Sequence, residues 1–232
     1  MDRKPYTKFD HDKHASSRDE TDFWGQIRRT VNGRPVDESQ ISMIVEEIAV
    51  KLSLAGNDVL LDLACGNGAL SSRLFPQLSG YLGIDSSPSL IGVAWKYFQR
   101  QPDFRFTISG ASEYVDAETE PLVFTKALCY GSFPYFSPVH ADNVLTLIHR
   151  KFANVERFFI GNLPDRLRAE AFYGAGNVDP VELSDYESAI GIWRSPGEFA
   201  DLARAHGWKA TISSMPGTYY AAHYRYDVLL TR

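Results

Sequence analysis

The chain has 232 residues, 44% of them hydrophobic and 23% charged, which predicts one globular domain rather than a disordered or fibrous protein. Lys and Arg total 24 against 29 Asp and Glu, and the resulting net charge of −5 argues against a broad surface for nucleic acid or anionic membranes. No apolar run reaches the roughly 20 residues of a membrane-spanning helix, and the polar N-terminus lacks the apolar core of a secretory signal. These features predict a cytoplasmic protein without a membrane partner.

The N-terminal 36 residues are predicted to form a flexible arm and lid, because the first twenty or so are charged and show no hydrophobic period. Residues 37–232 are predicted to form the folded domain. This domain is expected to begin with a helix that has Asp37 as its N-cap and Gln40 at the capping-box position.

Helical and strand patterns alternate through the rest of the chain. Strands are expected at 58–62, 81–85, 104–108, 122–129 and 157–161. Helices are expected after 87, at 139–152 and at 195–206. The last two strands, near 208–213 and 219–230, flank Pro216-Gly217 and are expected to form a hairpin. This order predicts an α/β fold with a doubly wound, mainly parallel sheet and one antiparallel strand.

A glycine-rich turn after the first of these strands is the most informative stretch. It reads Asp-Leu-Ala-Cys-Gly-Asn-Gly from Asp62 to Gly68 and leads into a helical stretch through Leu74. Small residues at Ala64, Gly66 and Gly68 let the backbone approach a ligand closely, and the start of the next helix directs free N–H groups toward it. In a doubly wound sheet, ligands bind in the crevice beyond such strand ends.

Two acidic residues make this turn more specific. Asp62 ends the first strand, where a carboxylate can attract a cation, and Asp85 ends the second strand, where a carboxylate can bind both hydroxyls of a ribose. A nicotinamide dinucleotide is the rival ligand, but its fingerprint needs a third glycine where Ser71 stands. If the ligand were a dinucleotide, the Asp62 carboxylate would face and repel its pyrophosphate. The same carboxylate would attract a positively charged sulfonium amino acid.

At these residues the chain resembles the class I S-adenosylmethionine (SAM)-dependent methyltransferases. Asp62 to Gly68 is similar to their first motif, and Gly83 to Ser87 is similar to the acidic second motif. The resemblance covers 37–232 and implies a seven-stranded sheet of order 3-2-1-4-5-7-6 with strand seven antiparallel. It also implies SAM as the cofactor and helices on both faces of the sheet.

The resemblance further implies which residues contact the cofactor. The implied residues are Trp24, Arg29, Asp62, Ala64, Cys65, Gly66, Gly68, Asp85, Ser86, Ala111, Ser112, Cys129 and Tyr130. Asp85 would bind the ribose, the Ala64 to Gly68 turn would hold the methionine part, and Asp62 would lie near its amino group. The chain departs from the family at Ala64, where a glycine is usual.

Three further roles follow from the resemblance. Many family members have Asp-Ala after the third strand, where this chain has Gly110-Ala111, so backbone groups, Ser112 or Glu113 would hold the adenine. The segment before the first core helix looks like an N-terminal lid in which Arg29, rather than Arg28, would bind the cofactor carboxylate. Trp24 would cover the site.

The acceptor and the proton-accepting residue are less defined. The loop that begins Cys129-Tyr130 would face the transferred methyl group, and it lacks the Asn-Pro-Pro-Tyr run of many enzymes that methylate nucleobase or glutamine nitrogens. His140, His223 and Tyr130 are the candidate catalytic residues. The histidines and the two cysteines, Cys65 and Cys129, show no metal-binding spacing, so no metal is expected.

The sequence therefore predicts a SAM-dependent methyltransferase that acts on a small molecule, at a hydroxyl of a sugar derivative or secondary metabolite. Two alternatives stay open. One is transfer to an amine or to a tRNA base, and the other is a non-catalytic module that retains the cofactor site. The oligomeric state is left undetermined by these patterns.

Overall fold

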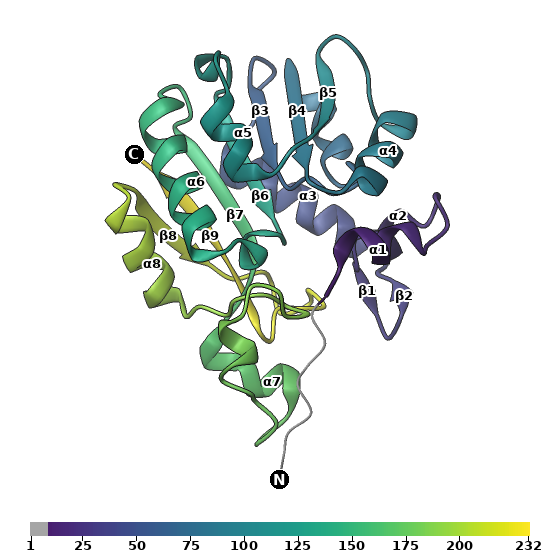
Figure 1. Ribbon diagram of the computed structural model, residues 1–232, viewed down its shortest axis with the longest axis vertical. Coiled ribbons are helices and arrows are strands. Elements are labelled where there is room, and N and C mark those ends of the chain that lie inside the picture. Colours follow the sequence, from purple (N-terminus) through teal and green to yellow (C-terminus); the bar gives the residue numbers. More distant parts are fainter. Residues whose placement is uncertain (1–8) are drawn as a thin grey trace.

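The computed structural model describes residues 9–232, and its centre is a seven-stranded sheet of order β5-β4-β3-β6-β7-β9-β8 (Figure 1). The strands are β3 (Val59–Leu63), β4 (Gly80–Asp85), β5 (Phe104–Ile108), β6 (Lys126–Tyr130), β7 (Arg157–Pro164), β8 (Lys209–Ser213) and β9 (Arg225–Thr231). β9 is antiparallel to both of its neighbours, and the pairs among β3 to β7 are parallel. The predicted order 3-2-1-4-5-7-6 with an antiparallel seventh strand is therefore confirmed.

Helices cover both faces of the sheet because successive strand residues point to opposite sides. In β3, Leu60 packs on one face and Leu61 on the other, and both are fully buried. The first face is covered by α3 (Glu38–Leu52) and α4 (Pro88–Tyr97). The second face is covered by α5 (Ala111–Ala117), α6 (Pro138–Lys151) and α8 (Pro196–Ala205).

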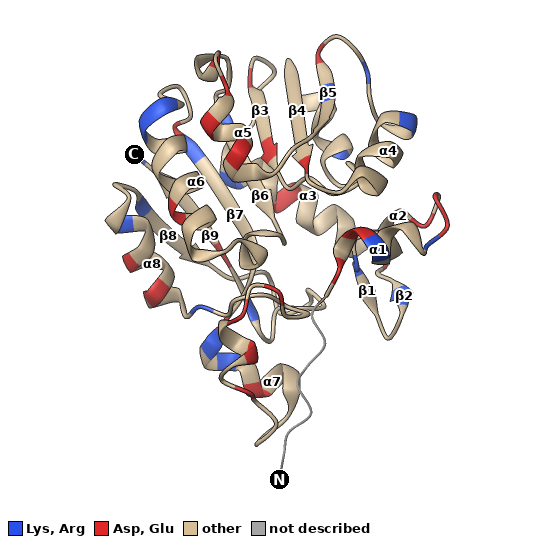
Figure 2. Cartoon of the chain, in the orientation of Figure 1, with Lys and Arg blue, Asp and Glu red and all other residues tan. Residues whose placement is uncertain are grey.

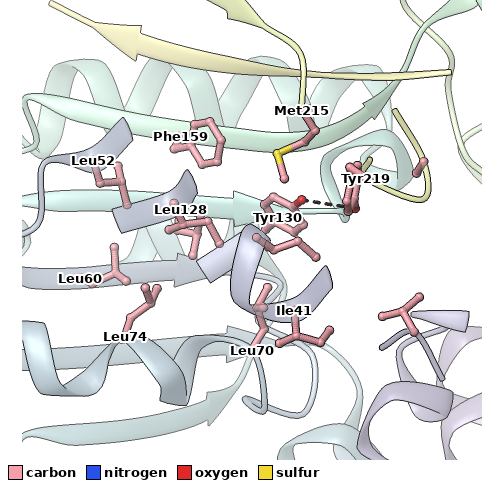
Figure 3. Close-up of a cluster of buried hydrophobic side chains, with 14 of the residues drawn as sticks. Ile41, Leu52, Leu60, Leu70, Leu74, Leu128, Tyr130, Phe159, Met215 and Tyr219 are labelled. Carbon is pink, nitrogen blue, oxygen red and sulfur yellow. Dashed lines mark hydrogen bonds between the residues drawn. The ribbon is translucent and has the colours of Figure 1, made fainter. Parts of the chain in front are cut away.

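The core between α3 and the sheet reaches the edge where the parallel strands end. Figure 3 shows Ile41 of α3 and Leu60 and Leu128 of the sheet in this cluster, with Tyr130 at its margin. The hydroxyls of Tyr130 and Tyr219 lie 3.5 Å apart there. Packing thus fixes the end of β6 next to the segment that precedes β9.

The helical stretch expected after the glycine turn is a 3₁₀ helix, Ser71–Gln77, rather than an α-helix. Pro76 lies inside it, and proline lacks the N–H that an α-helix needs at that position and clashes with the preceding turn. The contribution of aligned helix N–H groups to a ligand site is correspondingly small. Side chains must supply most of the polar contacts there.

The closing hairpin also differs from the expectation. Its second strand begins at Arg225 rather than near Tyr219, and the segment between is a series of turns. Gln40, expected in a capping box with Asp37, instead accepts a hydrogen bond from the backbone N–H of Tyr220 (2.9 Å), and Asp37 makes no side-chain cap. The Gln40 side chain therefore holds the pre-β9 segment against α3.

The N-terminal region contains more regular structure than the sequence predicts. It has α1 (His11–Ser16), α2 (Phe23–Gln26) and the short hairpin β1 (Thr30–Val31) and β2 (Arg34–Pro35). α1 packs against α4 (Figure 1). Capping of this helix by the Asp10 side chain explains why a segment without a hydrophobic period is helical. The predicted arm also includes residues 1–8, which lie outside the described range.

One further helix, α7 (Ala169–Tyr173), lies between β7 and α8. Figure 1 shows it below the strand ends, on the side of the sheet that also holds α1 and the N-terminal hairpin. The carboxyl ends of the parallel strands therefore face two additional segments, one from the N-terminus and one inserted after β7.

Candidate functional site

A pocket of about 950 Å³ lies at the carboxyl ends of the parallel strands. Its wall includes ten of the thirteen predicted cofactor residues: Arg29, Asp62, Ala64, Cys65, Gly66, Asp85, Ser86, Ala111, Ser112 and Tyr130. The acidic ends of β3 and β4 lie side by side at this edge (Figure 2). The predicted crevice is therefore a real cavity, and most of the predicted residues meet in it.

The glycine-rich turn takes a left-handed backbone at alternate residues. Ala64, Gly66 and Gly68 have φ values of 57°, 62° and 76°. The left-handed conformation costs roughly 1 kcal/mol or more for a residue with a Cβ, so Ala64 is strained where a glycine would not be. The carbonyl of Ala64 accepts a hydrogen bond from Ser132 (3.1 Å), which ties the turn to the loop after β6.

Asp85 is held in place by two backbone amides. Its Oδ2 accepts from the N–H of Gly66 and its Oδ1 from the N–H of Ser87, both at 2.9 Å. Burial raises the pKa of Asp85, and these two hydrogen bonds act in the opposite direction. Each carboxylate oxygen can accept a second donor. The Asp85 carboxylate is therefore fixed in position, and its two oxygens can each accept a further hydrogen bond from the hydroxyls of a diol in the pocket.

Asp62 is buried on the β3 side of the same turn. It accepts hydrogen bonds from the hydroxyls of Ser71 and Tyr81, the latter at 2.9 Å. Burial raises its pKa to about 7, while the two hydroxyls and the nearby Arg29 guanidinium lower it. A cation that enters the pocket next to Asp62 would favour the ionised carboxylate.

Arg29 supplies the positive charge on the opposite side. Its backbone is fixed by hydrogen bonds with Trp24 (2.8 Å) and Val36 (3.0 Å), and its guanidinium lies 4.8 Å over the ring of Tyr130. The side chain is 6% exposed, and its Nε has no hydrogen-bond partner among the described residues. An unpaired buried donor is costly, so the arrangement fits an anionic ligand group at this position.

The wall at the start of α5 is made by Gly110, Ala111, Ser112 and Glu113. Ser112 is buried, and its hydroxyl accepts a hydrogen bond from Asn143 (2.8 Å). These residues line the pocket where the resemblance places the adenine. Their individual contacts with a nucleobase stay predictions.

Three predicted cofactor residues do not line the pocket. A Cβ at Gly68 would lie 2.6 Å from the ring of Phe106, so this glycine is required for packing against β5. Cys129 points to the other face of the sheet, into the cluster under α6, whereas Cys65 lies in the pocket wall. Trp24 packs against the core cluster under α3 and does not cover the pocket.

The three candidate catalytic residues occupy different environments. His140 lines the pocket at the start of α6, with its Nε2 3.9 Å from Glu113. His223 is exposed, stacks on Tyr224 and does not line the pocket, which is a correction to its predicted role. Burial raises the pKa of Tyr130 far above its usual range, so its phenol does not serve as a base at neutral pH.

The helix α1 closes one side of the pocket. Asp12 accepts hydrogen bonds from the Ser87 hydroxyl (2.5 Å) and the Ser89 N–H (3.1 Å), so it caps the first turn of α4 from outside. His11 also lines the pocket, with its ring 4.3 Å from that of Tyr135. Burial and the neighbouring Arg28 lower the pKa of His11 to about 4. Its imidazole is therefore neutral at physiological pH.

Several pocket residues were not predicted from the sequence. They include His11, Arg28, Tyr135, Tyr224 and Arg225. Near the end of β7, Asn162 lines the pocket, whereas Asp165 caps the following turn by accepting from the Leu167 N–H (3.0 Å). The position of Asn162 near the end of a strand could have predicted its place in the pocket. No local sequence pattern indicates the other residues named above.

Residues 9–232 contain neither a cluster of metal-binding side chains nor a membrane-spanning helix. No group of three or more His, Cys, Asp or Glu side chains is arranged to hold a metal ion. No helix in this range is sufficiently long and apolar to cross a bilayer.

Comparisons with known proteins identify methyltransferases among the similar chains. No family model matches the chain. A 56-residue segment is 38% identical to a Schizosaccharomyces pombe protein named as an uncharacterized methyltransferase, and the match covers 24% of this chain and 22% of that protein. The chain thus spans only about a fifth of the length of this relative.

Solved structures match the whole fold at low sequence identity. The methyltransferase in complex with the Trm112 activator of Haloferax volcanii has a TM-score of 0.68 and 12% identity, with 97% of this chain and 98% of that chain covered. Magnesium protoporphyrin IX methyltransferase from Synechocystis PCC 6803, with bound S-adenosylhomocysteine (SAH), has a TM-score of 0.61 and 14% identity, and the coverages are 91% and 93%. The DhpI–SAM–HEP complex also scores 0.61 at 14% identity, with 96% and 94% covered. The chain has the class I methyltransferase fold.

Proposed function

We propose that this chain is a SAM-dependent methyltransferase with a small-molecule acceptor. The observation that carries the proposal is the meeting of Asp62, Asp85 and Arg29 in one pocket of this fold. SAM has a cationic amino group, a carboxylate and a ribose diol, and these three side chains offer one complementary group to each. The presence of SAM or SAH in structures of similar fold supports the same cofactor.

Each anchor has a distinct role in the proposal. Asp85, fixed by the amides of Gly66 and Ser87, binds the two ribose hydroxyls. Asp62 attracts the amino group, and the unpaired Nε of Arg29 donates to the carboxylate. Adenine lies along the wall formed by Ala111 and Ser112. These groups lie on strand ends, at the start of α5 and on the N-terminal lid, so the cofactor is oriented along one edge of the sheet.

SAM supplies an electrophilic methyl group when it is bound, so the protein must mainly align the acceptor and exclude water. The lid helix α1 contributes to exclusion, because Asp12 fastens it to α4 over the Asp85 side of the pocket. Of the three candidate proton acceptors, Tyr130 is disfavoured by its raised pKa and His223 lies outside the pocket, which leaves His140 in the pocket wall. It remains our candidate for the base.

The proposed acceptor is a small molecule that reacts through a hydroxyl, such as a sugar derivative or secondary metabolite. The pocket is partly enclosed by α1, and aromatic side chains such as Phe136 and Tyr220 line it. Aromatic walls bind a flat ring or the apolar face of a sugar. The loop after β6 reads Tyr130-Gly131-Ser132-Phe133 and lacks the Pro-Pro run typical of enzymes that act on nucleobase or glutamine nitrogens.

Calorimetric titration of the protein with SAM, SAH and NAD tests the cofactor. We expect SAM and SAH to bind and NAD not to bind. Asp85→Ala should weaken SAH binding by about 1–3 kcal/mol, because charge-assisted bonds are lost and two backbone amides lose their acceptor. Asp201→Ala, which removes an exposed carboxylate on α8, is the control and should bind like the wild type. Wild-type affinity in Asp85→Ala would contradict the ribose assignment.

Turnover is tested separately by incubating the protein with SAM and a panel of hydroxyl, amine and RNA acceptors. SAH release with hydroxyl-bearing small molecules supports the proposed acceptor. Tight, salt-dependent RNA binding with turnover would favour the tRNA alternative. SAM binding without turnover on the whole panel would favour a non-catalytic module.

A further inference from the structure

The pocket has a second end, away from Asp62 and Asp85, that the proposed cofactor contacts do not use. It is assembled from the residues before α1, the loop around residue 189 and the start of β9. β9 is antiparallel to β7, so its first residues lie at the same sheet edge where β7 ends. Two arginines from distant parts of the chain, Arg28 and Arg225, line this end.

Arg225 enters the pocket from the first position of β9. Its guanidinium donates to the backbone carbonyl of Asn162 and lies 4.7 Å from the ring centre of Tyr224. Burial lowers the pKa of Arg225, but the nearby oxygens of Tyr224, Tyr135 and Tyr220 raise it, and the net direction is upward. Arg225 therefore stays charged in an environment of phenols.

Arg28 reaches the same place from the N-terminal lid. Its guanidinium donates to the carbonyl oxygen of Ala189 (2.7 Å), and the Tyr135 hydroxyl donates to the same oxygen (3.1 Å). The Arg28 guanidinium also lies 4.2 Å from the ring centre of Phe9. Burial raises the pKa of Tyr135, and both Arg225 and Arg28 lower it, so both cations are close to this phenol.

Neither guanidinium forms a direct ion pair with a carboxylate of the described residues, although Asp227 is close enough to Arg225 for their charges to interact and Glu187 lines the same pocket. Among residues 9–232, no Asp or Glu lies within ion-pair distance of Arg28 or Arg225, although arginines outside the pocket form such pairs. These pairs are Arg18 with Asp22, Arg73 with Glu38, Arg166 with Glu198, Arg168 with Asp165, and Arg204 with Asp201. A guanidinium has five N–H donors, and Arg28 and Arg225 each donate to one backbone carbonyl. Arg225 also interacts with the Tyr224 hydroxyl, and the remaining N–H donors of the two guanidinium groups are available to a ligand or to solvent.

We propose that the methyl acceptor carries an anionic group, a carboxylate or a phosphate monoester, which Arg225 and Arg28 bind at this end of the pocket. This inference rests on the proposed function and names the substrate class of the same site. A guanidinium matches either anion through paired N–H donors. Tyr135 and Tyr224 lie beside the two cations and would pack against a flat molecular body attached to the anion. One anchored end then fixes which atom of the acceptor faces the cofactor.

Three small probes that share a benzene ring test this proposal: benzoate, phenyl phosphate and the neutral benzamide. Their affinities are measured by titration calorimetry or ligand-observed NMR with the full chain saturated with SAH. We expect one or both anions to bind at least about tenfold more tightly than benzamide, a ratio that corresponds to about 1.4 kcal/mol. The comparison of benzoate with phenyl phosphate distinguishes the two anion types.

Three variants connect the preference to the two arginines. Arg225→Gln should abolish most of the anion preference, and Arg225→Lys should retain part of it because the charge remains. Arg28→Gln provides a second variant outside the sheet, in case Arg225→Gln lowers stability through the lost bond to Asn162. Arg204→Gln, which changes a largely exposed arginine on α8, is the matched control and should keep the preference.

Equal binding of benzamide and the anions would overturn the proposal, as would absence of binding by all three probes. An anion preference that survives both Arg225→Gln and Arg28→Gln would also overturn it. SAH affinity is measured for every variant in parallel. If the wild type does not bind SAH, the result counts against the cofactor proposal. If the wild type binds SAH but shows no preference for the anionic probes, the result counts against this inference alone.

Discussion

The two ends of the pocket are built in different ways. At the proposed cofactor end, Asp85 and Asp62 project from the ends of adjacent strands and accept hydrogen bonds from the backbone or from buried hydroxyls. At the proposed acceptor end, Arg28 and Arg225 come from the N-terminal lid and from the start of β9, and each guanidinium lies against an aromatic ring. The comparison indicates that two of the three proposed cofactor anchors come from adjacent strand ends, whereas the two cations of the proposed acceptor end come from the N-terminal lid and the start of β9.

The largest expected effect that sharpens this comparison is at Arg29. Arg29→Met should lower SAH affinity by about ten- to one-hundredfold, because the cofactor carboxylate loses its charged partner. The free protein should be as stable as the wild type or more stable, since a buried unpaired donor is removed. Calorimetry and thermal unfolding measure the two quantities.

Arg204→Met is the control for Arg29→Met, because Arg204 is largely exposed and distant in sequence from the lid. Unchanged SAH affinity in Arg29→Met would show that the cofactor end does not use this guanidinium. Loss of stability and affinity together would instead indicate a structural role in the lid.

The acceptor end is expected to be sensitive to acid through His11. The folded-state pKa is lowered to about 4 from the ordinary value of 6.5, so the unfolded or undocked segment binds more protons between these values. The stability of the docked lid is complete above about pH 6.5 and falls as the pH decreases toward 4. At pH 5 the loss is about 2 kcal/mol.

Hydrogen exchange of α1 at pH 7 and pH 5, corrected for intrinsic rates, measures this loss. The wild type should lose protection at pH 5, and His11→Gln should show a much smaller change. An equal pH response in the two proteins would rule out His11 as the cause.

Asp62 should respond to pH in the opposite direction. Its folded-state pKa is raised from 3.8 to about 7, so its contribution favours the folded state below about pH 3.8 and is lost progressively as the pH rises from there to about 7. Asp62→Asn keeps an acceptor for Ser71 and Tyr81 without the charge. Above pH 7 the variant should be more stable by on the order of 1 kcal/mol, yet it should bind SAM more weakly.

Denaturant unfolding across pH 5 to 9 and SAM titration test Asp62→Asn. The variant should show a flatter stability profile than the wild type. Lower stability at pH 8 combined with unchanged SAM affinity would contradict both parts of the prediction.

The smallest expected effect is at Ala64. Ala64→Gly should stabilise the protein by up to about 1 kcal/mol, because glycine adopts the left-handed conformation without steric cost. The greater conformational freedom of glycine in the unfolded chain offsets part of this gain. Ala69→Gly, in the same turn region but without a positive φ, should destabilise the protein. Denaturant midpoints measure both, and a destabilising Ala64→Gly would show that the turn is not strained at this residue.

The difference between the two pocket ends also explains how much could be predicted from the sequence. Asp62 and Asp85 lie at strand ends that the local pattern indicates, and the strand order implied by the family resemblance places the two strand ends side by side, as the structure does. Arg225 and His11 lie on the same pocket through tertiary packing alone. The sequence pattern gave no reason to connect them.

The errors in the prediction have similar physical causes. Gly68 does not line the pocket and leaves room for the Phe106 ring, and the alternation of residues along β6 places Cys129 on the other face of the sheet. His223 was expected on a longer final strand, whereas the structure begins that strand at Arg225 because Gln40 holds the preceding turns. Single-residue direction was therefore harder to predict than the order of the elements.

The most direct test of the central claim is a crystal structure of this protein with SAH. The account predicts the nucleoside in the crevice between the Ala64–Gly68 turn and Arg29, with the Asp85 carboxylate within hydrogen-bond distance of both ribose hydroxyls. An empty crevice at saturating SAH, or the nucleoside bound with its ribose away from Asp85, would contradict it.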